Sequence, residues 1–390
     1  MTVGVPQMVD PGRCPSGDER GDDYVLANLG YFDIPRDLTH VQEKDCPEIR
    51  RVVLRRIHNA RGAGCTLRTC GFTLFDEDLP APSPEDLRHN RGARRRFFRG
   101  TEKSLREKLS HPENFDLEPG ERIVRVLAYH HSTRTSSTSN DRRAKPVIAD
   151  CHTDFTRDSG AMVLRMVLGA RGEDAVAEDI IASCDPDASG RSRSRYVFMN
   201  VWRSLDRNGP VKAWPLAVMH PGSNLLGSRH SDHGQDADYA VKLKPSTTAF
   251  PENYILRTDR TEEDPSAPGG HYWLYYPNMT AAESLVFVNY DSKRTSPAFV
   301  FHGAFDTAAQ SGDGLPTRIS VEVRVLVVTE RDRLSKKAVG GVVHSTNSTS
   351  GICRNFQRGR CKREDGCRYE HATGNQGSES APCDHCNYSA

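Results

Sequence analysis

The second half of the chain alternates between apolar and polar positions in short runs. Residues 318–324 (RISVEVR) alternate strictly, so charged and hydroxyl side chains share one face of a predicted strand while isoleucine and valine share the other. Gly, Pro, Asn and Asp separate such runs, as is typical of strand ends. Strands are predicted over residues 71–75, 123–129, 196–202, 216–219, 239–243, 271–276, 285–290, 298–301 and 319–329.

The first half carries fewer alternating runs and more helical ones. Residues 85–109 and 174–183 are predicted as helices, and residues 160–168 fit either a helix or a strand. Residues 132–140 are rich in Ser and Thr and predict a loop. Many short strands after a more helical start are typical of a sandwich or jelly roll. We therefore predict a mainly β fold with flanking helices.

Breaks in this pattern divide the chain into five parts. The predicted parts are a disordered tail over residues 1–23, a folded domain over 24–332, a linker over 333–352, a compact cysteine-rich motif over 353–372 and a disordered tail over 373–390.

Composition indicates a polar surface around a modest core. Of the 390 residues, 36% are hydrophobic, and the formal net charge is +1, which excludes a chain that binds polyanions over its whole surface. The first residues lack the basic and apolar regions of a secretory signal. The apolar runs are too short to span a bilayer, so we expect a cytoplasmic or nuclear protein with no membrane association.

His152 and Asp154 stand two positions apart, which places both side chains on the same face of an extended strand. Two imidazoles and one carboxylate form the ligand set of mononuclear non-heme Fe(II) sites, which leave positions open for a cosubstrate and O₂. His302 completes such a set far downstream. By position alone, other histidines are equally eligible as the third ligand: His230, His233 and His271.

Arg318 opens the alternating strand sixteen residues after His302. A planar guanidinium binds a carboxylate through two parallel hydrogen bonds, so an arginine of this strand, Arg318 or Arg324, is predicted to bind the far carboxylate of 2-oxoglutarate. The alternative interpretation is that the histidines are core or surface residues and Asp154 belongs to a turn. The motif alone does not exclude it.

Eight blocks, in order over residues 45–330, resemble the asaB-like hydroxylase/desaturase family, which includes gibberellin-desaturase-like and cephem-methoxylase-like proteins. The blocks are residues 57–61 (IHNAR), 70–72 (CGF), 152–156 (HTDFT), 200–203 (NVWR), 271–280 (HYWLYYPNMT), 290–292 (YDS), 302–305 (HGAF) and 318–324 (RISVEVR). The chain departs from the family at Gly303, where a hydroxyl or Cys is more common, and this departure concerns the substrate pocket.

The resemblance implies an Fe(II)- and 2-oxoglutarate-dependent oxygenase on a double-stranded β-helix, also called a jelly roll. It implies hydroxylation or desaturation of a small organic metabolite. Matching positions assign the iron ligands to His152, Asp154 and His302, with His271 as a rival for the third position. The candidate ligands of the cosubstrate, or of another acid group, are Arg318, Arg324 and Arg203.

Cys353, Cys361, Cys367 and His371 are spaced C-x7-C-x5-C-x3-H near the end of the chain. Three thiolates and one imidazole close a tetrahedral Zn(II) shell, and metal binding supplies the folding free energy of so short a segment. Five of the eleven cysteines lie at or after Cys353, which favours metal ligation over disulfides in a chain without a secretory signal. The spacing resembles that of CCCH zinc fingers, which commonly bind single-stranded RNA.

Basic and aromatic residues are interleaved with these zinc ligands. Phe356 and Tyr369 offer ring faces for base stacking, and a local excess of three positive charges suits phosphate. The basic candidates for RNA binding are Arg358, Arg360, Lys362 and Arg368. A finger that docks a protein is the alternative.

Three functions are compatible with this sequence. The first is a working oxygenase whose finger targets it. The second is an RNA-binding protein whose oxygenase-like domain is a non-catalytic scaffold. Methyl transfer is the third and ranks last, because no Gly-rich nucleotide loop followed by an acidic residue is present.

Overall fold

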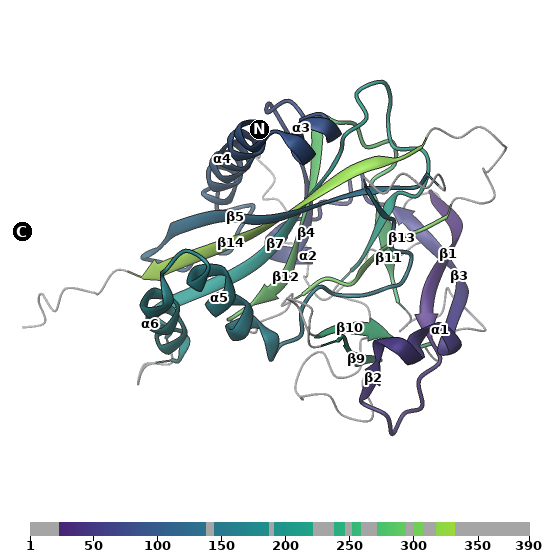
Figure 1. Cartoon of the computed structure of the whole chain (residues 1–390), viewed down its shortest axis with the longest axis horizontal. Helices are drawn as coiled ribbons and strands as arrows, with labels where there is room; N and C mark the ends of the chain where they lie inside the picture. The colour runs from purple at the N-terminus through teal and green to yellow at the C-terminus, as the bar shows by residue number, and fades with distance from the viewer. Residues whose placement is uncertain are drawn as a thin grey trace, which may run out of the picture. The chain divides into compact units, whose positions relative to one another are not determined.

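One six-stranded sheet and two smaller sheets form the framework of the described chain (Figure 1). In this computed structural model the chain divides into the units Met1–Arg333 and Leu334–Ala390, and the described residues belong to the first. Those residues are 23–137, 144–186, 191–220, 238–245, 252–258, 271–293, 299–306 and 317–331. The predicted zinc ligands and RNA-binding residues lie outside them, so the finger stays a prediction.

The largest sheet has the strand order β4-β12-β7-β14-β5-β6. In that order the strands span Phe72–Asp76, Glu283–Asp291, Ser194–Ser204, Ile319–Arg331, Glu121–Thr135 and Lys145–Pro146. All neighbours pair antiparallel except β5 with β6. The central strands β7 and β14 are buried along nearly their whole length, as expected of strands covered on both faces.

The smaller sheets have the orders β1-β3-β11-β8-β13 and β10-β9-β2. The first consists of Tyr24–Phe32, Arg50–Asn59, Trp273–Tyr275, Leu216–Met219 and His302–Ala304. The second consists of Glu252–Leu256, Tyr239–Leu243 and His40–Gln42. His302 is therefore the first residue of a three-residue strand at the edge of the five-stranded sheet.

Helices cover both faces of the largest sheet. Helix α4 (Arg91–Leu109) packs into a core cluster that contains Val327. Helices α5 (Ser159–Gly169) and α6 (Asp174–Cys184) pack into another cluster, which contains Leu326. Because successive residues of β14 point to opposite faces, the two groups of helices lie on opposite sides of the sheet. Among the described residues, no helix is long and apolar enough to cross a membrane.

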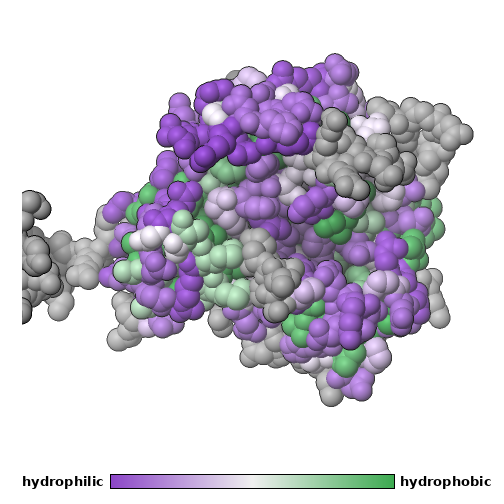
Figure 2. Space-filling view, viewed as in Figure 1, coloured by the Kyte–Doolittle hydropathy of each residue, from purple (hydrophilic) through white to green (hydrophobic). Residues whose placement is uncertain are grey.

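The outer surfaces of these helices differ in polarity (Figure 2). The surface over α4 is strongly hydrophilic, and Arg95 and Arg96 are exposed there. Hydrophobic residues reach the surface over α5 and α6, including Met162 and Val176. The remaining short elements are η1 (Glu43–Asp45), α1 (Cys46–Ile49) and α2 (Leu67–Cys70).

The helix predicted over residues 85–109 is in fact two helices, α3 (Pro84–His89) and α4. Asn90 separates them with extended backbone (φ −107°, ψ 95°), and its side chain accepts a hydrogen bond from the N–H of Ala93. Such a cap contributes about 1 kcal/mol to helix stability, so asparagine here favours a new helix start.

Other boundaries differ from the predicted ones where polar residues join a sheet. Strand β5 continues to Thr135, into the predicted loop over residues 132–140, because β14 pairs with it residue by residue. The strand predicted over residues 298–301 lies instead at His302–Ala304. Residues 160–168 belong to helix α5. The prediction of a mainly β chain with flanking helices is confirmed.

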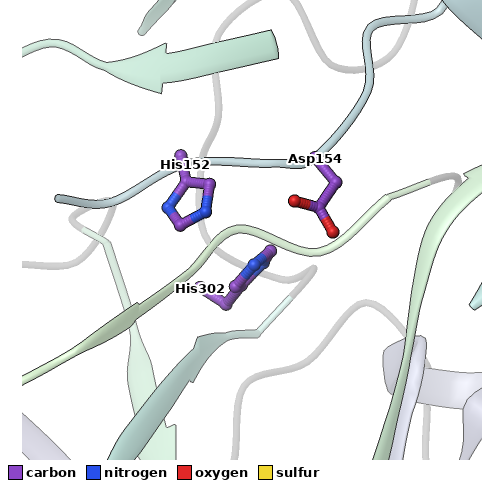
Figure 3. A group of neighbouring side chains, drawn as sticks. All are labelled: His152, Asp154 and His302. Carbon is purple, nitrogen blue, oxygen red and sulfur yellow. The ribbon is translucent and has the colours of Figure 1, made fainter. Parts of the chain in front are cut away.

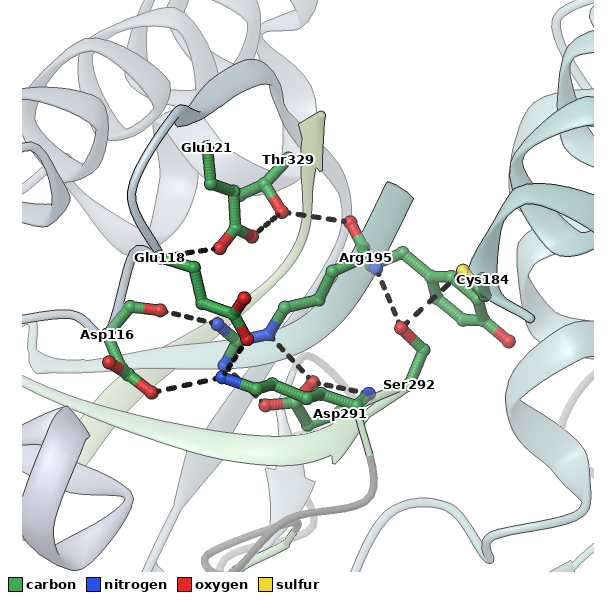
Figure 4. A network of polar contacts seen from close by, with 10 residues as sticks. Asp116, Glu118, Glu121, Cys184, Arg195, Asp291, Ser292 and Thr329 are labelled. Carbon is green, nitrogen blue, oxygen red and sulfur yellow. Dashed lines mark hydrogen bonds and ion pairs between the residues drawn. The ribbon is translucent and has the colours of Figure 1, made fainter. Parts of the chain in front are cut away.

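A buried polar network joins the ends of four strands (Figure 4). Arg195 of β7 forms an ion pair with Asp291 of β12 at 2.5 Å and donates to the carbonyl oxygen of Asp116 at 2.7 Å. Beside it, Thr329 of β14 donates to the carboxylate of Glu121 in β5. These contacts fix how the strands are aligned at the end of the sheet.

Candidate metal centre

A short extended segment between β13 and β10 carries two of the predicted iron ligands. The N–H of His152 donates to the carbonyl oxygen of His302 at 3.0 Å, and His302 donates back at 2.9 Å. The N–H of Thr153 donates to the carbonyl oxygen of Tyr254 at 3.0 Å. Since side chains alternate, His152 and Asp154 point to one site while Thr153 is fully buried. The predicted H-x-D strand is therefore a bridged segment and not a regular strand.

The side chains of His152, Asp154 and His302 converge (Figure 3). Their ligand atoms all lie within 4.8 Å of one another, and the two imidazole centroids are 4.5 Å apart. No other three His, Cys, Asp or Glu side chains gather in this way in the described parts of the chain. The structure thus brings together the three predicted ligands from two distant segments.

Both imidazoles are held by backbone carbonyl groups. Nδ1 of His152 lies 2.7 Å from the carbonyl oxygen of Asp150, and Nδ1 of His302 lies 3.1 Å from that of Val300. A carbonyl oxygen only accepts, so each Nδ1 carries the proton and each Nε2 keeps a lone pair for a metal. Burial, and then His302, hold the pKa of His152 well below its usual value, which favours the neutral form that metals bind.

The carboxylate of Asp154 is held by three donors. Asn200 and Asn289 donate to Oδ2 at 2.8 and 3.1 Å, and Arg324 donates to Oδ1 at 2.8 Å. Burial alone raises the pKa of Asp154, but Arg324 and the other neighbours outweigh burial and bring the pKa below its usual range. The carboxylate is therefore ionised and fixed in orientation.

The chemistry of the three ligand side chains fits Fe(II). Two neutral imidazole nitrogens and one ionised carboxylate oxygen form the facial set of non-heme iron oxygenases. The partners of His152, His302 and Asp154 supply the outer hydrogen bonds that such ligands need to keep their orientation.

A small cavity of about 20 Å³ opens beside the three ligands. Trp202 and Glu322 of the six-stranded sheet line it, together with Arg318, which directly precedes β14, and Leu216 of the five-stranded sheet. The alternation predicted for residues 318–324 is confirmed here, since the polar face of β14 meets the cavity while Val321 and Val323 lie in the core cluster with α4.

Arg318 is the predicted cosubstrate ligand that lies in this cavity. Its Nε donates to Ser320 Oγ at 3.1 Å, Nη1 donates to the carbonyl oxygen of Trp214, and its guanidinium carbon lies 4.9 Å from the Trp202 ring centroid. Trp214 has φ = 50°, a strained conformation for a bulky residue, and this aims its carbonyl at Arg318. Burial, and then Arg134, lower the pKa of Arg318 to about 9, so a carboxylate bound beside it would stabilise its charge.

The structure places the other two predicted arginines differently. Arg324 is engaged in the ion pair with Asp154 and so orients an iron ligand. Arg203 lies away from the cavity, where its guanidinium donates to the carbonyl oxygens of Leu79 and Ala281 at 2.8 and 2.6 Å. It alternates with Trp202 along β7, so it points to the opposite face of the sheet. Both placements argue against a cosubstrate role.

His271, the rival third ligand, lies in another part of the core. Its Nδ1 is 3.2 Å from the hydroxyl of Tyr31, and the two rings stack with centroids 5.6 Å apart. His230 and His233 lie outside the described residues. His302 is therefore the histidine that the structure assigns to the group.

Gly303 lies against the segment that precedes His152. A Cβ at this position would lie 3.2 Å from the carbonyl oxygen of Asp150 and 3.4 Å from that of Ala149. Glycine at position 303, where the family more often has a hydroxyl residue or Cys, thus lets β13 approach the metal-binding segment closely.

Sequence reasoning missed several polar residues near the metal group. Asn200 and Asn289 hold Asp154, and each interrupts an apolar run within its strand, which was the available signal. Arg134 and Glu322 line the cavity, and burial together with Asp154 raises the pKa of Glu322, which favours its neutral form. Lys244 lies close enough to interact with Asp154, and burial lowers the pKa of Lys244 to about 8.

A family model described as "Oxidoreductase/YMDC permease-like domain" matches residues 35–328. The match covers the three grouped ligands and the strands of the six-stranded sheet, up to Val328 in β14. It ends before the predicted finger.

Curated relatives are similar over about half of the chain. Hydroxylase/desaturase efuI of Hormonema carpetanum is 27% identical over 197 residues, which are 49% of this chain and 54% of that protein. Hydroxylase/desaturase CTB9 of Cercospora beticola is 26% identical over 210 residues, 53% of this chain and 58% of that protein. Aspirochlorine biosynthesis protein N of Aspergillus oryzae is 27% identical over 202 residues, 52% and 72% of the respective chains. The predicted resemblance to hydroxylase/desaturase proteins is confirmed, and the match spans little more than half of the first two relatives.

A solved structure shares the fold. It is titled iron and alpha-ketoglutarate-dependent endoperoxidase NvfI, and it covers 79% of this chain and 99% of its own, with a TM-score of 0.57 and 20% sequence identity. The same protein in a different conformation gives a TM-score of 0.56 at 19% identity. This similarity confirms the predicted oxygenase-like, jelly-roll type of fold, and it concerns the fold alone.

Proposed function

The chain belongs to the Oxidoreductase/YMDC permease-like domain family, and from this we propose that it is an Fe(II)- and 2-oxoglutarate-dependent oxygenase that hydroxylates or desaturates a small organic molecule. The observation that carries the proposal is the convergence of His152, Asp154 and His302 on one cavity wall. The printed names of the hydroxylase/desaturase relatives and of the NvfI structure support the same class.

In this proposal the three ligands hold Fe(II) from one side and leave the cavity side open. Bound iron supplies the oxidising power, and 2-oxoglutarate and O₂ are consumed to give succinate, CO₂ and oxidised product. The chain itself provides geometry: carbonyl groups fix both imidazoles, and Asn200, Asn289 and Arg324 fix the carboxylate.

Arg318 binds the far carboxylate of 2-oxoglutarate, and Arg134 adds positive charge to the same wall. The cosubstrate is a dianion, so buried guanidinium groups complement it. Glu322 also lines this wall, and burial together with Asp154 raises its pKa. Trp202 lies under the Arg318 guanidinium and limits its motion.

Succinate formation by the purified full chain, with Fe(II), 2-oxoglutarate and O₂, tests the proposal. We expect turnover in the wild-type protein and none in Asp154→Ala, which should also lose Fe(II) in equilibrium dialysis. Arg318→Gln should raise the 2-oxoglutarate concentration needed for half-maximal rate by about tenfold or more, since hydrogen bonds to a charged group contribute about 1.5–3 kcal/mol.

Arg203→Gln is the matched control, because Arg203 is also a buried arginine of the same sheet but lies away from the cavity. If both arginine variants change the 2-oxoglutarate requirement equally, the assignment of Arg318 is wrong. If the wild-type protein binds Fe(II) and forms no succinate with any oxidisable compound offered, the non-catalytic scaffold is favoured.

The C-terminal motif is the second part of the proposal. Cys353, Cys361, Cys367 and His371 bind Zn(II) as a CCCH finger, which binds single-stranded RNA or a partner protein. The ligand spacing and the interleaved Phe356 and Tyr369 support this role. The finger favours the cytoplasm or nucleus as its location.

Zinc content and RNA affinity test this second part separately from oxygenase activity. Cys361→Ser should release one zinc per chain, and Phe356→Ala should weaken binding of single-stranded RNA by about tenfold, because stacking contributes about 1–3 kcal/mol per base. Unchanged RNA affinity in both variants would leave the finger as a protein-docking module.

A further inference from the structure

A second group of reactive side chains lies apart from the three iron ligands. Cys65 precedes the one-turn helix α2, and Cys70 is its last residue. Sγ of Cys70 lies 3.5 Å from Nε2 of His220 and 3.5 Å from Oγ1 of Thr69. His220 follows strand β8 and is buried, as is Cys70. Neither sulfur takes part in a described disulfide.

The surroundings of Cys70 favour its thiolate. A hydrogen bond from the Cys65 thiol is the largest influence, and with His220 and Thr69 it outweighs burial and lowers the pKa of Cys70 to about 4. Burial instead raises the pKa of Cys184 to about 11 and that of Cys151 well above its usual value. The pKa values of the thiols of this chain thus differ widely.

Access to the pair runs through Cys65. Its side chain is partly exposed, whereas Cys70 is 5% exposed. A small neutral oxidant can approach Cys70 from the side of Cys65. The Cys65 sulfur is then suited to react with the sulfenic acid that forms first at Cys70.

We propose that Cys70 and Cys65 form a peroxide-reactive dithiol, in which Cys70 is the attacking sulfur, His220 stabilises its thiolate and Cys65 closes a disulfide. This site is independent of the proposed oxygenase activity. Hydrogen peroxide is the oxidant, and cellular thiols of the glutathione type reverse the reaction by thiol–disulfide exchange.

The reaction proceeds in two balanced steps. The Cys70 thiolate attacks hydrogen peroxide, an S–O bond forms, the O–O bond breaks, and hydroxide leaves and takes up a proton to give water. Cys65 sulfur then attacks the Cys70 sulfenic acid, an S–S bond forms, the S–O bond breaks, and the hydroxyl leaves as water with the Cys65 proton. Overall, two thiols lose two electrons and one peroxide becomes two waters.

A disulfide is favoured over a metal site by the geometry of the group. Among the described residues, only the iron ligands place three donor atoms within 4.8 Å of one another, so Cys65, Cys70 and His220 do not form a compact ligand set. Only four residues separate the two cysteines, and Cys65 is the neighbour that most lowers the pKa of Cys70.

Strands β4 and β12 connect this site to the iron ligand His302. The two cysteines flank the Thr66–Thr69 capping box of α2, so closing a disulfide must reshape this turn. Cys70 is followed by Gly71, in the left-handed conformation, and by β4, whose Phe72 pairs with Phe287. The ring of Phe287 lies 4.6 Å from that of His302.

Peptide-resolved mass spectrometry of the intact full chain, treated with stoichiometric hydrogen peroxide at pH 7, tests the proposal. We expect a disulfide between Cys65 and Cys70 that dithiothreitol reverses. In Cys65→Ser, a sulfenic acid should persist at Cys70 and react with dimedone. Cys70 should be consumed at least about tenfold faster than Cys184, the partly exposed cysteine with a raised pKa.

His220→Gln is the second variant, and it should slow oxidation of Cys70 without changing that of Cys184. Oxidation of Cys70 at the rate of Cys184, or no Cys65–Cys70 disulfide in the wild-type protein, would overturn the proposal. Protection of both thiols by added Zn²⁺ in the protein as purified, with no disulfide formed after the metal is removed, would instead show a metal site. The wild-type measurement stands even if a variant fails to fold.

Discussion

Two buried arginine–aspartate pairs lie in this domain, and only one belongs to the metal centre. Arg324 donates to Asp154 at 2.8 Å, and Arg195 donates to Asp291 at 2.5 Å. All four side chains are largely buried. A buried ion pair alone therefore says little about function, since the same pair of residue types can serve structure or chemistry.

The difference lies in what else each carboxylate meets. Both oxygens of Asp291 accept from Arg195, and one also accepts from the N–H of Lys293, so the carboxylate is satisfied within the protein. Asp154 lies instead within 4.8 Å of ligand atoms of two imidazoles, His152 and His302. The metal centre is marked by ligand atoms whose lone pairs converge in the interior. Converging lone pairs repel one another, and a bound cation removes that repulsion.

Cavity size does not make this distinction. A cavity of about 650 Å³ borders Arg195, whereas the cavity at the iron ligands is about 20 Å³. The larger space is lined by charged residues already engaged with one another, such as Lys293 with Glu118. The chemistry of the lining, more than its volume, identifies the candidate active site.

The largest expected effect separates the two aspartates by metal binding. Asp154→Ala should abolish Fe(II) binding, while Asp291→Asn should leave the iron affinity unchanged. Loss of an outer partner alone lowers metal affinity by about 10–100-fold, and loss of a ligand has a larger effect. Equilibrium dialysis with Fe(II) under anaerobic conditions measures both, and equal affinities in the two variants would remove the distinction.

The converse effect is on folding stability. Asp291→Asn should lower the free energy of unfolding by about 3–5 kcal/mol, because it leaves the Arg195 guanidinium buried without its counter-charge. Urea denaturation followed by circular dichroism measures this. Asp33→Asn, which breaks an exposed pair with Arg51, is the control and should change stability by less than about 1 kcal/mol. A small effect at Asp291 would show that water reaches the pair.

A smaller effect is expected at the amides that hold the iron carboxylate. Asn200→Ala and Asn289→Ala should each weaken Fe(II) binding by about 10–100-fold, since Asp154 then loses a donor that fixes its orientation. The Asn200 variant should lose more, because its contact is the shorter one. Asn253→Ala, at another buried asparagine, is the control. Iron affinities equal to that of the control would show that Arg324 alone orients the carboxylate.

The smallest effect concerns acid stability near the Asp154 pair. His130 lies opposite Arg324 in the β5–β14 ladder, and burial, followed by Arg324, lowers the pKa of His130 to about 4. The unfolded chain takes up this proton near pH 6.5, before the folded chain does, so stability is full above pH 6.5 and falls as pH drops towards 4. His130→Gln should flatten this fall in urea titrations of the metal-free protein. The exposed His40→Gln should not, and identical slopes in both variants would contradict the assignment.

Most of the sheet framework follows from local pattern. Strand β8 spans Leu216–Met219 as predicted, and β9 spans Tyr239–Leu243. Apolar alternation predicts these strands because burying one face or both dominates their stability. Strands β1, β2, β3, β6 and β10 were not predicted, and the end of β5 was predicted as loop. In β5 the reason is tertiary, since polar Ser132 and Thr135 are held by pairing with β14.

The sequence by itself determined the residue types of the iron site: His152 and Asp154 on one face of an extended segment, and a later histidine. It left His302 and His271 as rivals, and it treated Arg318 and Arg324 as equivalent. Tertiary structure decided both questions, because strand pairing sets His302 beside His152 and aims Arg324 at Asp154. Contacts between distant segments depend on sheet register and packing, and local periodicity does not contain them.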